Sequence, residues 1–162
     1  MPEIVINTGP IIALVAATDT LTRLSALYQT VWMPREVFDE LAAGGPNAPE
    51  SGLVQAASAT IRVSPALISI PCDLTNELDW GEASVIHTAV QRGIGTVAID
   101  EKAGRRVARL HGLRVTGTLG ILVKAKQQGL LQNLTQCLDK MKAHGVWVSD
   151  DLVKQAIAAV GE

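Results

Sequence analysis

The sequence predicts an α/β fold in which a parallel central sheet lies between two layers of helices. Short β-branched apolar segments alternate along the chain with longer segments whose apolar residues recur at helical spacing. Such alternation is typical of parallel strands that are joined by crossover helices. The chain has 162 residues, 48% of them hydrophobic, and shows no internal repeat or linker. These values predict one domain, spanning residues 1–162, with one core.

The first half begins with an apolar β-branched segment that ends at Asn7-Thr8-Gly9-Pro10. Glycine and proline interrupt a strand, and proline is accepted in the first turn of a helix. Pro34 is expected to open a helix in the same way, and Asp19 or Thr20 is expected to cap a short one. In order, the expected elements are a strand at 3–7, a helix with Pro10 in its first turn, a helix at 21–27, a strand at 31–33, a helix from Pro34 through 41, a helix at 53–59 and a strand at 61–63.

The second half is punctuated by glycines that follow expected helices, where glycine adopts the left-handed conformation that ends a helix. Gly93, Gly112 and Gly129 are placed in this way, and Thr118 is expected to cap the helix before Gly129. In order, the expected elements are a Gly- and Pro-rich loop at 43–50, an irregular segment at 65–72, a helix at 83–92, a strand at 96–100, a helix at 102–111, a strand at 113–115, a helix at 118–128, a helix at 134–143, a small strand at 146–148 and a helix at 151–160.

Charges are segregated along the chain, although the formal net charge is only −2. Residues 1–101 carry four Lys or Arg against twelve Asp or Glu, whereas residues 102–138 carry seven Lys or Arg and no acid. One interpretation is an acidic region that gathers divalent cations beside a basic segment that holds phosphates. The alternative is a set of solvated helix faces, which charge alone favours.

Several classes of protein are excluded by missing patterns. Cys72 and Cys137 form no CxxC pair, which excludes zinc fingers and thioredoxin-like motifs and is typical of a reducing cytosol. The apolar segment at 4–17 is too short to span a bilayer, so a cytoplasmic protein without membrane contact is expected. Aromatic residues make up 3% of the chain, so base stacking is not expected to be the main mode of nucleic-acid binding. The sequence has neither a GxxxxGK(S/T) phosphate loop nor an HExxH or GxSxG motif.

Polar residues that directly follow parallel strands are the first candidates for a functional site, because ligands bind at the carboxyl ends of such strands. Asn7 and Asp100 have this position. Glu40, near the end of the third expected helix, and Glu82, at the start of the next long one, are expected to approach from flanking helices. Three carboxylates and one amide oxygen suit Mg²⁺ or Mn²⁺ rather than zinc. The predicted chemistry is metal-assisted, in-line hydrolysis of a phosphodiester.

Each of these four residues also has an ordinary structural explanation when it is taken alone. Asn7 is a turn former and Asp100 a helix cap, while Glu40 is a solvated helix residue. Glu82 is an acid favoured by the positive end of a helix. The hypothesis of a site therefore depends on all four occurring together.

Several segments resemble the PIN-domain-like family DUF3368, which is related to the toxin nucleases of VapBC systems. The resemblance implies a three-layer α/β/α PIN fold with an acidic cluster that, in active members, binds Mg²⁺ or Mn²⁺ and cleaves single-stranded RNA. It runs the whole length of the chain, and the segments that carry it are Ile6–Leu14, Met33–Leu41, Leu78–Ala83, Ile99–Arg105, Gly112–Lys126, Trp147–Leu152 and Val160–Glu162.

The resemblance also implies a role for each candidate. Asn7 falls where PIN nucleases place their first aspartate, and Glu40, Glu82 and Asp100 match the second, third and fourth acids. Asn7 is a departure, because an amide keeps an oxygen ligand but removes one negative charge and so weakens metal affinity. The basic residues that follow Asp100 are expected to hold RNA phosphates, and they are Lys102, Arg105, Arg106 and Arg109.

The leading hypothesis is a ribonuclease that acts as the toxin of a toxin–antitoxin pair. The resemblance further implies a homodimer and a small antitoxin protein as partner. The alternative, which Asn7 favours, is a catalytically silent PIN-like domain that binds nucleic acid or a protein partner without cleavage. A third interpretation, an interaction domain with no role in nucleic-acid binding, is favoured only by the low net charge.

Overall fold

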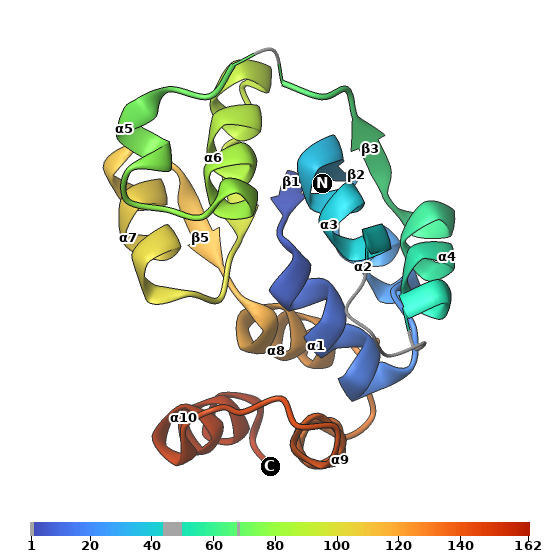
Figure 1. Cartoon of the computed structure of the whole chain (residues 1–162). Coiled ribbons are helices and arrows are strands. Elements are labelled where there is room, and N and C mark those ends of the chain that lie inside the picture. Colours follow the sequence, from blue (N-terminus) through green and yellow to red (C-terminus); the bar gives the residue numbers. More distant parts are fainter. Residues whose placement is uncertain (1, 44–49, 68) are drawn as a thin grey trace.

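The computed structural model describes residues 2–43, 50–67 and 69–162 and shows a five-stranded sheet at its centre (Figure 1). All neighbouring strands run parallel, in the order β3-β2-β1-β4-β5. The strands are β1 (Glu3–Ile6), β2 (Thr30–Pro34), β3 (Arg62–Ser64), β4 (Thr96–Ala98) and β5 (Arg114–Thr116). The predicted parallel α/β sheet is confirmed.

Helices cover both faces of this sheet, which gives a three-layer α/β/α fold. One layer has α6 against β1, β2 and β4, with α5 and α7 beside it, and the other has α1, α2 and α8. The last two helices, α9 and α10, pack on α1 and α8 at the bottom of Figure 1. No helix in the described ranges is both long enough and apolar enough to cross a membrane. The helices are α1 (Thr8–Thr18), α2 (Thr22–Leu27), α3 (Arg35–Ala43), α4 (Glu50–Thr60), α5 (Cys72–Thr75), α6 (Trp80–Arg92), α7 (Lys102–Leu110), α8 (Thr118–Gln127), α9 (Leu134–Ala143) and α10 (Asp150–Val160).

Strand β1 is the place where the chain reverses its direction across the sheet. The chain adds β2 and β3 on one side of β1, and later adds β4 and β5 on the other side. Because crossovers between parallel strands are right-handed, the helices that follow β1 and β4 go to opposite faces. The carboxyl ends of β1 and β4 therefore form the topological switch point, where open α/β sheets bind their ligands.

The two strands at the switch point are apolar after their first residues, Glu3 and Thr96. Ile4, Val5 and Ile6 of β1 are completely buried, as are Val97 and Ala98 of β4. A strand that is covered on both faces needs apolar residues at successive positions, which explains why these strands do not alternate with polar residues. The hydrogen bond from Asn7 N to Ala98 O, 3.1 Å long, extends the pairing by one residue past β1. It fixes the backbone of Asn7 at the edge of the sheet.

Some helices begin at other residues than expected. Pro34 ends β2, and α3 begins only at Arg35, while α4 and α6 begin three residues earlier than predicted, at Glu50 and Trp80. Leu21 directly precedes α2, and Thr20 Oγ1 accepts a hydrogen bond from Thr22 N, the first residue of that helix, at 3.1 Å, so of the two predicted caps Thr20 is the one that bonds to α2. Asp19 instead ends α1 in a left-handed conformation, with a φ of 62°.

Other local differences lie in the second half and in the predicted loop. Thr118, which was predicted to cap α8, is instead the first residue of that helix and follows the N-cap residue Gly117. The Thr118 hydroxyl donates a hydrogen bond to Asp100. The predicted strand at 146–148 is wrong, because these residues pair with no strand among those described. Helix α5 begins at Cys72, the last residue of the segment 65–72 that was predicted to be irregular. Most of the predicted loop, residues 44–49, lies outside the described residues, and its two ends belong to α3 and α4.

Candidate functional site

Side-chain oxygens from three elements converge on the space beside Gly81, at the start of α6. A Cβ atom placed on Gly81 would lie 2.8 Å from Glu40 Oε2, 3.3 Å from Asn7 Oδ1 and 3.5 Å from Asp79 Oδ1. Asn7 is only 5% exposed, so its amide forms the floor of this space, whereas Glu40 and Asp79 reach solvent. The missing side chain of Gly81 is what leaves room among the three oxygens.

Glu82 is held by the first turn of α6. Asp79 Oδ1 accepts a hydrogen bond from Glu82 N at 2.8 Å, and Glu82 Oε2 accepts one from Asp79 N at 3.4 Å. This reciprocal pair is a capping box, so the structural explanation for Glu82 holds as well. The Glu82 side chain is 5% exposed, and a Cβ on Gly104 would lie 3.3 Å from its carboxylate. Gly104 thus lets α7 approach the buried acid closely.

Asp100 follows β4 and is oriented by the start of α8. Its Oδ1 accepts a hydrogen bond from Thr118 N at 2.8 Å, and its Oδ2 accepts one from Thr118 Oγ1 at 2.6 Å. A Cβ on Gly117 would lie 2.6 Å from Asp100 Oδ1 and 2.8 Å from Arg105 Nη1, so the carboxylate also lies beside a guanidinium group. Each carboxylate oxygen has a second lone pair, which leaves Asp100 able to accept a further ligand.

The acids around Gly81 repel one another. Burial raises the pKa of Glu40, and the charges of Asp79 and then Glu101 raise it further. Burial is also the largest cause that raises the pKa of Glu82, followed by Asp79, with smaller contributions from Glu101 and Glu40. A bound cation would relieve this repulsion, because it would favour the charged form of each carboxylate.

Asp79 and Glu101 were not among the site residues predicted from the sequence. Asp79 stands three residues before Glu82, and this spacing of a capping box was a signal that could have placed its carboxylate beside the site. Glu101 directly follows Asp100, and a Cβ on Gly9 would lie 3.4 Å from Glu101 Oε1 and 3.9 Å from Asp100 Oδ2. No sequence pattern shows that Glu101 faces the first turn of α1.

The arrangement fits a hard divalent cation bound mainly through water. In residues 2–43, 50–67 and 69–162, no three His, Cys, Asp or Glu side chains are close enough together to enclose a metal ion. Mg²⁺, however, keeps several water ligands and needs only one or two carboxylates. The open space beside Gly81 offers oxygen ligands alone. The buried Thr8 Oγ1 makes no hydrogen bond among the described residues, but it lies close enough to the Glu40 carboxyl to lower the pKa of that group.

The four predicted RNA-binding residues of α7 have different surroundings. Arg105 is half-buried and donates from Nη1 to Ile99 O at 2.8 Å, so it braces the end of β4. Burial is the largest cause that lowers the pKa of Arg105, followed by the charge of Arg109. Arg106 is exposed and forms an ion pair with Glu77. Lys102 and Arg109 are exposed as well.

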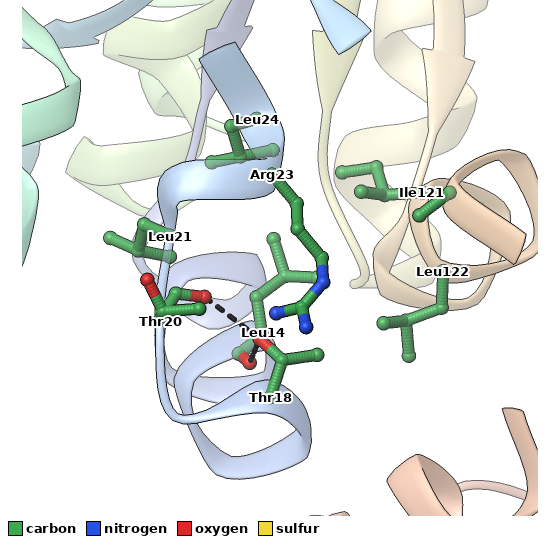
Figure 2. A pocket seen from close by; sticks show the side chains of 9 residues that line it. Leu14, Thr18, Thr20, Leu21, Arg23, Leu24, Ile121 and Leu122 are labelled. Atoms are coloured by element: carbon green, nitrogen blue, oxygen red, sulfur yellow. Dashed lines mark hydrogen bonds between the residues drawn. The ribbon is translucent and has the colours of Figure 1, made fainter. Parts of the chain in front are cut away.

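A small cavity lies elsewhere, between α1, α2 and α8 (Figure 2). It holds about 10 Å³, room for one water molecule at most. Arg23 borders it, donating from Nε to Leu130 O at 2.9 Å, while its Nη1 is buried without a partner among the described residues. The lining residues are Leu14, Thr18, Thr20, Leu21, Arg23, Leu24, Ile121, Leu122 and Ala125. The cavity takes no part in the acidic site and is too small for a substrate.

Comparison with known proteins identifies the family. The family DUF3368, described as a PIN domain, matches residues 3–162. A search of the curated proteins finds no match. The match includes every strand of the sheet and all the acids around Gly81. The chain therefore belongs to the PIN-domain family DUF3368, and its fold is of the nuclease type.

Proposed function

We propose that this PIN domain is a ribonuclease that uses Mg²⁺ or Mn²⁺ to hydrolyse phosphodiester bonds in single-stranded RNA. The observation that carries the proposal is the convergence of oxygens from Asn7, Glu40 and Asp79 on the open space beside Gly81. This convergence lies at the switch point of the sheet, where a ligand is expected. A divalent ion bound there supplies an activated water and stabilises the negative charge that develops on the phosphate.

The protein's own residues have distinct roles in this proposal. Asn7 and Glu40 would present their oxygens to the ion beside Gly81, whereas Glu82 and Asp100 would hold it through water, and Thr118 fixes the orientation of Asp100. Arg105 sets the end of β4 through its bond to the backbone. The positive charges that face solvent on α7 attract the RNA backbone, and they belong to Lys102, Arg106 and Arg109.

A pair of substitutions in α3 tests the metal site. Glu40→Gln removes one negative charge from the space beside Gly81, whereas Asp39→Asn removes one from the exposed ion pair with Arg35, 3.0 Å long. Each variant keeps its shape and differs from the parent by one charge. We expect Glu40→Gln to weaken Mn²⁺ binding in calorimetry by about tenfold or more and to reduce cleavage of a single-stranded oligonucleotide.

The control decides what the result means. Asp39→Asn should bind Mn²⁺ and cleave RNA as the parent does, because its carboxylate is exposed and paired on the surface of α3. Equal losses in both variants would show only a general effect of charge. Unchanged Mn²⁺ affinity in Glu40→Gln would contradict the proposed site.

Asn7 favours a second candidate, a silent PIN domain that binds RNA or a protein without cleaving it. The Asn7 amide brings an oxygen to the acids but no charge, so the site attracts a cation less strongly than one with aspartate. Asn7→Asp should therefore raise the Mn²⁺ affinity. Cleavage that appears only in this variant would favour the silent domain over the ribonuclease.

The role of toxin, the homodimer and the small antitoxin belong to the same proposal and rest on the resemblance to the VapBC nucleases. A short reading frame next to the gene, whose product forms a stable complex with this chain and stops RNA cleavage, is the expected result. Sedimentation of the chain alone as a monomer would contradict the homodimer.

A further inference from the structure

An exposed tryptophan borders the acidic site. Trp80, the first residue of α6, is 58% exposed, and its neighbours in the chain are Asp79 and Gly81. Adjacent Cα atoms lie about 3.8 Å apart, so the backbone of Trp80 begins one residue away from the space where Glu40 and Asn7 present their oxygens. A large, solvent-exposed side chain therefore leaves the backbone one residue from the site.

Among the described residues, the Trp80 side chain neither packs in the core nor makes a hydrogen bond. The buried face of α6 is formed by residues later in the helix, and Trp80 is absent from the apolar core and from the side chains that pack against it. Trp32 differs in both respects, because it packs against the core and donates from Nε1 to Glu3 Oε2 at 2.7 Å. Arg92 also lies over the Trp32 ring, 4.1 Å from its centroid. The indole of Trp32 is thus structural, whereas that of Trp80 is free.

Two features favour a nucleic acid as the ligand of Trp80: the proposed site for a phosphodiester begins at the next residue, and the basic helix α7 lies close to the segment before it. The charged residues nearest to Trp80 in the chain are the acids Asp79, Glu82 and Glu77, which a cation bound beside Gly81 would offset, and Glu77 forms an ion pair with Arg106 of α7. A nucleotide presents both an aromatic face and a phosphate, which suit an indole with a guanidinium group nearby. Bases that are not paired stack on exposed aromatic side chains regardless of their sequence.

We propose that the indole of Trp80 stacks on one unpaired base of the RNA, at the nucleotide next to the phosphate that a cation bound at the acids would hold. This inference rests on the proposed function, because it takes single-stranded RNA as the ligand. A single stacked base does not require the many aromatic residues that larger binding platforms use. It is also compatible with an aromatic content of 3%.

The test measures RNA binding in EDTA, so that neither metal binding nor cleavage enters the result. A labelled single-stranded oligonucleotide is titrated with the parent and with Trp80→Ala, Trp80→Phe and Trp147→Ala, and fluorescence anisotropy is recorded. Trp147 is the control, because it is 83% exposed and lies between α9 and α10, which pack on α1 and α8. Circular dichroism checks that each variant is folded.

We expect Trp80→Ala to weaken binding by about tenfold, because that is a typical loss when a stacked aromatic is removed. Trp80→Phe should retain most of the affinity, and Trp147→Ala all of it. The same oligonucleotide in a duplex should bind the parent and Trp80→Ala equally, because its bases are already stacked in pairs. Together these results would establish the stacking contact.

Three results would overturn the inference. They are unchanged binding of single strands by Trp80→Ala, an equal loss in Trp147→Ala, and no binding of RNA by the parent. Failure of the proposed ribonuclease gives a different pattern. In that case RNA binding still depends on Trp80, whereas the parent shows no metal-dependent cleavage, and the stacking inference stands.

Discussion

Replacement of Gly81 by alanine probes the site without changing any charge. The added Cβ would lie 2.8 Å from Glu40 Oε2, closer than ordinary van der Waals contact. Because this oxygen ends a flexible side chain, it must recede by roughly half an ångström, and the backbone need not move. Asn7 Oδ1, at 3.3 Å, must give by a few tenths of an ångström.

The magnitudes of the two effects separate binding from folding. Alanine is favoured over glycine inside a helix by up to about 1 kcal/mol, which offsets the cost of moving Glu40. We therefore expect the free energy of unfolding to change by less than about 1 kcal/mol. The methyl group, however, occupies the space among the oxygens, and the Mn²⁺ affinity should fall by about tenfold or more.

The assay combines urea unfolding with Mn²⁺ calorimetry, and Gly52→Ala serves as the control. Gly52 lies in α4, and a Cβ there would meet nothing within 4 Å in the part of the chain that the structure describes. This control should gain up to about 1 kcal/mol of stability and keep the parent's Mn²⁺ affinity. If folded Gly81→Ala binds Mn²⁺ as tightly as the parent does, the space beside Gly81 is not the metal site and the reasoning is refuted.

Three further predictions concern stability, pH and the position of one acid. Hydrogen bonds from the first backbone N–H groups of α9 are the main cause that lowers the pKa of Glu162 to about 2. The stability that the Glu162 carboxylate contributes is therefore complete above the ordinary pKa of 4.5 and is lost as the pH falls towards 2. Glu162→Gln should lower the urea midpoint at pH 7 but change it little at pH 2. The pKa values of Glu40 and Glu82 are raised in the folded protein. The stability that these two carboxyl groups contribute when protonated is therefore lost as the pH rises above 4.5 and passes their pKa values in the folded state. Melting temperatures in EDTA and in Mn²⁺ should diverge over that range, and parallel curves would contradict a cation that relieves the repulsion. Thr118→Val removes the hydroxyl that donates to Asp100 at 2.6 Å, and it should weaken Mn²⁺ binding by about tenfold in calorimetry while a serine variant retains it.

The sequence predicts the parts of this molecule that depend on apolar pattern. The strands at the switch point and the helices on both faces follow from short β-branched segments and helical spacing. Because parallel strands present their carboxyl ends at one edge, the same pattern predicts where Asn7 and Asp100 lie. The positions of these two residues required no knowledge of any contact.

The parts that sequence reasoning missed depend on contacts between distant segments. Threonine is a common residue at helix caps, but the Thr118 hydroxyl donates its hydrogen bond to Asp100, eighteen residues earlier, and not to its own helix. Asp79 was missed as a site acid because its capping of α6 is local, whereas its approach to Glu40 requires α3 and α6 to be packed together. The predicted strand at 146–148 has the apolar pattern of a strand but no neighbour with which to pair.

The central position of β1 has a consequence for biosynthesis. Val5 pairs with Val97 and Ile6 with Ala98, so one side of β1 is synthesised long before its partner strand, which lies about ninety residues later in the chain. Contacts of such long sequence separation slow folding. An unfinished chain therefore carries Asn7 and Glu40 but lacks Asp100 and the backbone that orders the edge of β1. Under the proposed function, cleavage would begin only after translation has passed β4, so an unfinished chain would not cut the messenger RNA that encodes it.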